Sequence, residues 1–173
     1  MNVQIFIPCF IDQLYPQTGF NMVKVLEKVG CTVHYNPAQT CCGQPAFNSG
    51  YRNDAKKVAC KFMSDLAGDD PIVTPSASCS GYVRNYYKEL FPDESEKVNQ
   101  FSSRIKELSE FLVDDLHITS LGARLHGKAT YHDSCAALRE CKIKESPRKL
   151  LEQVEGLELI EMEHNETCYG FGG

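Results

Sequence analysis

The sequence predicts an α/β fold made of two repeated, Rossmann-like βαβ halves with mainly parallel sheets, the second half being truncated. Three observations support this prediction. Short apolar segments alternate with helical patterns along the chain. Several of the expected strands are followed directly by a cysteine, and the spacing of those cysteines occurs twice.

The first part of the chain begins with an apolar strand and a helix. Residues 3–8 are the strand, which ends at Cys9, and residues 15–29 carry apolar side chains at helical spacing. Gly30 ends that helix. Because helices alternate with strands, we expect βαβ units and a mainly parallel sheet. The further elements expected in this part are strands at 32–35 and 71–74 and helices at 53–66, 82–91 and 96–112.

The second part repeats the cysteine spacing of the first. A strand at 128–132 leads to Cys135, a helix follows at 147–154, and a strand follows at 157–160. Thirty-one residues separate Cys9 from Cys41, and 32 separate Cys135 from Cys168. We therefore expect a first module at 1–125 and the start of a second, incomplete module at 126–173. An incomplete sheet exposes an edge, so we also expect self-association through the C-terminal half.

Composition excludes several classes of protein. The net charge of −5 argues against a nucleic-acid partner, because such a surface is basic. No apolar run approaches the roughly 20 residues of a membrane span, so no membrane span is expected. The first residues carry no positive segment of a secretory signal, and we expect a cytoplasmic protein. The nine cysteines are an odd number, which argues for metal or redox chemistry rather than a paired disulfide framework.

Four cysteines form the principal candidate site: Cys9, Cys41, Cys42 and Cys79. They come from three loops expected at the carboxyl ends of parallel strands, where α/β proteins build their sites. Soft thiolates select iron–sulfur clusters, zinc or copper(I), and four suffice for a [4Fe–4S] cluster. Gly43 permits the sharp turn that two adjacent ligands need, and lets backbone N–H groups approach the sulfur atoms.

The spacing of these cysteines, with the segments Phe6–Cys9, Cys41–Pro45 and Tyr131–Cys135, resembles the cysteine-rich Cys-Cys-Gly domain family. Members of that family include heterodisulfide reductase B-type subunits and the iron–sulfur subunits of glycolate oxidase and anaerobic glycerol-3-phosphate dehydrogenase. The resemblance implies an electron-transfer subunit, without catalytic residues of its own, in a cytosolic complex that oxidises a 2-hydroxy acid such as L-lactate. The implied cofactor is a [4Fe–4S] cluster, and the implied partners are the other subunits of that complex.

The sequence departs from the family pattern in ways that keep two alternatives open. Tyr169 stands where a second Cys-Cys-Gly would have a cysteine, so Cys135 and Cys168 remain candidate metal ligands of an incomplete site. Cys79 has no nearby partner cysteine, which favours an ordinary cubane over a five-thiolate cluster. The alternatives are a cluster-dependent disulfide reductase subunit and a zinc-stabilised binding module without redox activity. We expect His132 and Asp133 to make only local hydrogen bonds.

Overall fold

The computed structural model describes residues 1–168 and 170 of the chain. The chain forms two compact units, one at Met1–Leu108 and one that begins at Ser109. Residues 109–125, which the sequence repeat assigns to the first module, thus pack with the second unit. No helix in the described residues is both long and apolar enough to cross a membrane.

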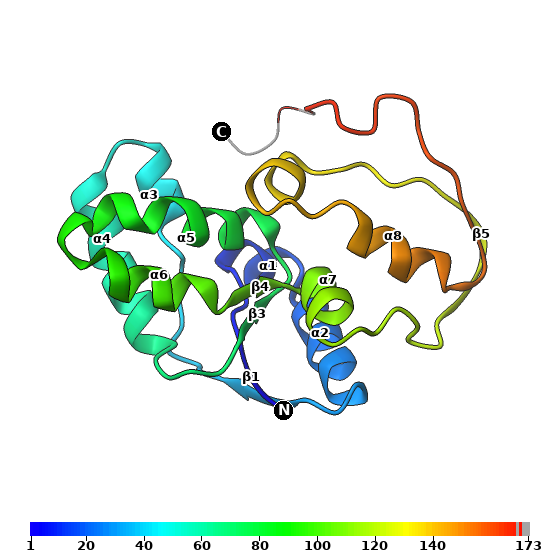
Figure 1. Ribbon diagram of the computed structural model, residues 1–173, viewed down its shortest axis with the longest axis horizontal. Helices are drawn as coiled ribbons and strands as arrows, with labels where there is room; N and C mark the ends of the chain where they lie inside the picture. The colour runs from blue at the N-terminus through cyan, green and yellow to red at the C-terminus, as the bar shows by residue number, and fades with distance from the viewer. Residues whose placement is uncertain (169, 171–173) are drawn as a thin grey trace. The chain divides into compact units, whose positions relative to one another are not determined.

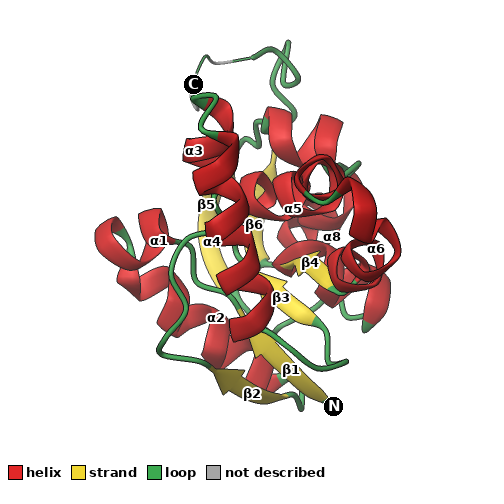
Figure 2. Ribbon diagram, turned by 90° about the vertical axis from the view of Figure 1, so that its left-hand side faces the viewer, coloured by secondary structure: helices red, strands yellow, loops and turns green. Residues whose placement is uncertain are grey.

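The first unit is built on a four-stranded parallel sheet (Figures 1 and 2). Val3, Ile5, Ile72 and Val73 are fully buried in it, which explains why its central strands read as apolar runs. The prediction of an α/β fold with parallel strands is confirmed. In the order β2-β1-β3-β4, the strands are β1 (Asn2–Ile5), β2 (Thr32–Tyr35), β3 (Ile72–Thr74) and β4 (Ile105–Glu107).

Helices flank both faces of this sheet, with α1 and α2 on one side and α4, α5 and α6 on the other (Figure 1). An aromatic core fills the second side, where Phe62 contacts Phe6, Tyr87 and Phe101 edge-on. The helices of the unit are α1 (Cys9–Leu14), α2 (Pro16–Lys28), α3 (Gln44–Asn48), α4 (Arg52–Asp65), α5 (Ala77–Leu90), the 3-10 helix η1 (Pro92–Glu94) and α6 (Ser95–Ser103).

The single helix expected at 96–112 is interrupted, because residues 105–107 form a strand before helical structure resumes at Leu108. Helix α6 ends at Ser103, and Ile105–Glu107 form the edge strand β4 beside β3. Apolar residues continue at helical spacing through Ile105 because this side chain is buried against the sheet core. Ile72 donates its backbone N–H to the carbonyl of Arg104 at 2.9 Å, and this pairing overrides the local helical pattern.

The second unit contains a two-stranded parallel sheet, with helix α8 in the crossover between its strands (Figure 1). Exposed ion pairs join the strands, Arg124 to Glu155 and Lys128 to Glu158. The elements are β5 (Arg124–Ala129), α8 (Glu145–Glu152), β6 (Glu155–Leu159) and the π-helical turns η2 (Phe111–Asp115) and η3 (Ala136–Glu140); α7 (Leu108–Glu110) spans the boundary between the units.

Candidate metal centre

The four candidate thiols lie on the loops that follow β1, β2 and β3. Cys9 is the first residue of α1, which three residues separate from the end of β1, and Cys79 lies in the first turn of α5, after β3. Cys41 and Cys42 end the loop after β2, just before α3. Since the strands are parallel, all three loops meet at the carboxyl edge of the sheet.

The four sulfur atoms form a continuous row. The Cys9 thiol donates to Cys41 with Sγ atoms 3.8 Å apart, and the Cys42 thiol donates to Cys79 with Sγ atoms 3.4 Å apart. The adjacent thiols of Cys41 and Cys42 also form a hydrogen bond. The exposure of the side chains falls from Cys9, which is exposed, to Cys42, which is buried; Cys79 is half-buried.

These contacts divide the thiols into proton donors and acceptors. The hydrogen bond from Cys42 lowers the pKa of Cys41 to about 5, and the N–H of Gly43 adds to this effect. The hydrogen bond from Cys42 likewise lowers the pKa of Cys79. Cys42 loses both hydrogen bonds when it ionises and is buried, so its pKa rises. Burial raises the pKa of Cys9. The lowered pKa of Cys41 favours its thiolate form, which is the form that binds a soft metal.

Gly43 shapes the turn beside the two adjacent thiols. Its φ of +93° lies in the left-handed region, and a Cβ there would stand 3.3 Å from the carbonyl oxygen of Ala55. The Gly43 N–H donates to the sulfur of Cys41 at 3.4 Å. A glycine is thus required both by the backbone conformation and by the close approach of α4.

Two residues that the sequence analysis missed fix the cysteine loops. The buried Tyr87 hydroxyl donates to the carbonyl oxygen of Cys42 at 2.7 Å. Ser76 caps α5 by accepting the backbone N–H of Cys79 at 3.4 Å. A serine before a helical pattern is a recognisable capping signal. Nothing in the sequence distinguishes Tyr87 from the other aromatic residues of the core.

The donor set fits a soft metal or an iron–sulfur cluster, because four sulfur atoms converge without a competing hard ligand. Near them, the buried Tyr82 hydroxyl has no hydrogen-bond partner, and the charges of Cys41 and Cys42 act on it. In the described residues, no group of three or more His, Cys, Asp or Glu is arranged so that it could hold a metal ion. Binding therefore requires the sulfur atoms to leave their present contacts and regroup around the ligand.

The two cysteines expected in the second module lie together in the second unit. Cys135 and Cys168 are within hydrogen-bonding distance, and the hydrogen bond that the Cys135 thiol donates to Cys168 raises the pKa of Cys135. The N–H of Gly170 donates to the Cys168 sulfur at 3.4 Å and lowers the pKa of that thiol. The remaining cysteines, Cys31, Cys60 and Cys141, lie in neither group.

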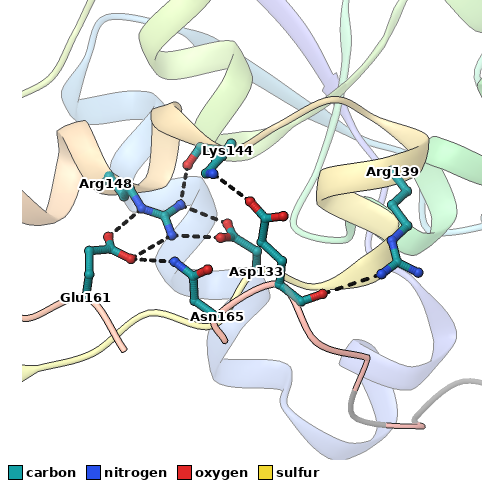
Figure 3. A network of polar contacts seen from close by, with 7 residues as sticks. Asp133, Arg139, Lys144, Arg148, Glu161 and Asn165 are labelled. Atoms are coloured by element: carbon teal, nitrogen blue, oxygen red, sulfur yellow. Dashed lines mark hydrogen bonds and ion pairs between the residues drawn. The ribbon is translucent and has the colours of Figure 1, made fainter. Parts of the chain in front are cut away.

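Asp133 does more than the local hydrogen bonding expected of it. Its carboxylate is buried and accepts two hydrogen bonds from Arg148, at 2.7 and 2.8 Å (Figure 3). Arg148 also donates to Glu161 at 2.6 and 3.1 Å. The network therefore connects the loop after β5, helix α8 and the segment after β6. His132 contacts the carbonyl oxygen of Thr167 at 2.8 Å.

Comparison with known proteins places this arrangement of cysteines in a family. The model of the CCG cysteine-rich domain matches residues 3–84 and 129–173, which include both groups of cysteines. Lactate utilization protein A of Shouchella clausii is 46% identical over 100% of this chain and 73% of its own length. The protein of that name from Geobacillus kaustophilus is 43% identical over the same shares. The chain belongs to the CCG cysteine-rich domain family, together with relatives named Lactate utilization protein A.

Proposed function

We propose that the chain is an iron–sulfur electron-transfer subunit of a bacterial system that oxidises L-lactate. The convergence of Cys9, Cys41, Cys42 and Cys79 at one sheet edge is the observation that carries this proposal. The name of the relatives supports lactate as the substrate of the system. The partners would be the other subunits, and the protein would act in the cytoplasm.

These four residues would hold a [4Fe–4S] cluster through their sulfur atoms. When bound, such a cluster supplies a carrier for single electrons. The Gly43 N–H donates toward the sulfur of Cys41, and hydrogen bonds to ligand sulfur atoms are one means by which a protein tunes a cluster potential. Tyr87 holds the backbone of Cys42 in place. The buried Cys42 side chain excludes water on one side of the site.

The exposed Cys9 gives the site an open side. Electrons would enter and leave there, because a partner protein can approach only where the ligand sulfur reaches the surface. No residue of this chain is assigned to the oxidation of the hydroxy acid, and we place that step in a partner subunit.

One observation favours zinc as the second candidate. Four cysteine thiolates are a ligand set of structural zinc sites, and four cysteine side chains converge here. A zinc site would make the first unit a structural module without redox activity.

Metal and sulfide analysis after anaerobic reconstitution separates the two candidates. We expect about four irons and four sulfides per chain, with visible charge-transfer absorption that reductant bleaches. Cys42→Ser should lose most of this iron, whereas Cys60→Ser should keep it because Cys60 lies outside the site. Stoichiometric zinc that excludes iron, or iron unaffected by Cys42→Ser, would overturn the cluster assignment.

Lactate oxidation is tested separately, in a bacterium that lacks its own Lactate utilization protein A. The chain should restore growth on L-lactate, and the Cys42→Ser variant should not. Restoration by the Cys42→Ser variant would contradict a role for the cluster in lactate oxidation. A loaded cluster without restored growth would contradict lactate as the substrate, while leaving the metal assignment intact.

A further inference from the structure

The second unit holds a two-thiol site outside the four-cysteine row. Cys135 comes from the loop after β5, and Cys168 comes from the segment after β6. Their side chains are within hydrogen-bonding distance although 32 residues separate them in the sequence. Cys168 is exposed and Cys135 is half-buried, so reagents in solution can reach the pair.

Backbone contacts hold the two segments side by side at this point. The N–H of Asp133 donates to the carbonyl oxygen of Asn165 at 2.9 Å. The His132 ring contacts the carbonyl oxygen of Thr167 at 2.8 Å. Each of these contacts lies within three residues of Cys135 and of Cys168. They therefore hold the two segments next to each other where the thiols lie.

Charged side chains fasten the same two segments to α8 (Figure 3). Arg148 connects Asp133, two residues before Cys135, to Glu161 at the beginning of the other segment. Asn165 donates to Glu161 at 2.6 Å, which ties the network toward Cys168. Hydrogen bonds and ion pairs thus position the two segments that carry the thiols.

Two further cations hold Glu166, two residues before Cys168. Lys144 forms an ion pair with its carboxylate at 2.6 Å. Arg139 donates to its backbone carbonyl oxygen at 3.4 Å (Figure 3). These contacts hold the segment that carries Cys168, and Cys168 is the more exposed thiol of the pair, so a reagent in solution reaches it first.

We propose that Cys135 and Cys168 form a reversible dithiol–disulfide site that low-molecular-weight disulfides oxidise. The Cys168 thiolate attacks one sulfur of the small disulfide, forms a mixed disulfide and releases one small thiolate. Cys135, on losing its proton to solvent, then attacks the Cys168 sulfur and displaces the second small thiolate. Two electrons pass from the protein thiols to the small disulfide, which becomes two thiols once protonated.

Oxidation at this site has a structural consequence within the second unit. The new bond joins the segment after β6 covalently to the loop after β5, which only hydrogen bonds and ion pairs connect in the reduced protein. Both sulfur atoms are then unable to bind a metal, because a disulfide offers no thiolate. The redox state of small thiols thus decides whether these two side chains are available as ligands.

Peptide mapping of the full chain tests this proposal without any activity assay. The reduced protein is treated with oxidised glutathione, remaining thiols are blocked with N-ethylmaleimide, and trypsin digestion is followed by mass spectrometry. Trypsin places Cys135 in the peptide 129–139, Cys141 in 140–142 and Cys168 in 150–173, so each thiol is identified separately. We expect the linked peptides 129–139 and 150–173 as the main product, lost on reduction.

Two variants sharpen the result. Cys135→Ser should lose the linked product and leave glutathione attached to Cys168. Cys141→Ser should keep the product, because the buried Cys141 takes no part. Circular dichroism of each variant checks that the fold is retained. Glutathione on both thiols without linkage, unreacted thiols at both positions, or linkage of Cys168 to Cys141 in comparable yield would overturn the proposal. None of these outcomes depends on iron binding in the first unit.

Discussion

Arg148→Met should destabilise the second unit strongly. The Asp133 side chain is 1% exposed and that of Arg148 is 8% exposed, so the substitution leaves a buried carboxylate without its cation. Breaking a buried ion pair in this way costs about 3–5 kcal/mol. The Glu161 side chain is 47% exposed, and its pair with Arg148 adds little to this figure.

Hydrogen exchange measured on peptides detects this loss in the second unit alone. The amide of Asp133, which donates to Asn165, should exchange faster by about two to three and a half powers of ten, since 1.4 kcal/mol is tenfold. The acceleration ends where unfolding of the whole unit becomes easier than local opening. Peptide-level data are required because the two compact units need not unfold together.

Arg124→Met is a matched control in the same unit. Arg124 pairs with Glu155 across the strands, but their side chains are 75% and 62% exposed. Such a pair contributes less than about 1 kcal/mol, so exchange should accelerate by less than about fivefold. The double variant Asp133→Asn/Arg148→Met should recover part of the lost stability, because it buries no unpaired charge. Equal exchange in Arg148→Met and Arg124→Met would refute this reasoning.

Two further predictions concern the glycine turn and acid stability. Gly43→Ala should lower the free energy of unfolding by more than the left-handed strain of about 1–2 kcal/mol, because the added Cβ also approaches the carbonyl oxygen of Ala55. The same variant should bind less iron. Gly50→Ala, with φ of +83° and no atom within 4 Å of its Cβ, should cost the strain alone; equal urea midpoints for the two variants would contradict the close approach. The pKa of Glu161 is lowered from its ordinary 4.5, chiefly by Arg148. Its contribution to stability is therefore present above pH 4.5 and is lost as the pH falls through the lowered pKa. The Glu161→Gln variant should show a shallower loss of urea stability on acidification, and an unchanged pH slope would contradict the assignment.

Local patterns in the sequence were enough to predict the parallel α/β arrangement and the loops that carry the cysteines. Val3 and Ile5 lie in an apolar run because their strand is covered on both faces. Cys9 and Cys79 lie within a few residues of the ends of such strands, so the geometry of a parallel sheet brings them to one edge. Gly43 follows two cysteines, where only a sharp turn lets both side chains serve one site.

The tertiary structure alone decided which residues support these cysteines and where a helical pattern gives way to a strand. Ile105 continues the apolar spacing of a helix, but pairing with β3 places it in a strand. Tyr87 reaches the carbonyl of Cys42 from 45 residues away, and Arg148 joins Asp133 to Glu161 across three segments. The spacing of apolar residues along the sequence indicates only which side chains of a single helix or strand face the core. Contacts between distant elements depend on how those elements pack, and no local pattern records them.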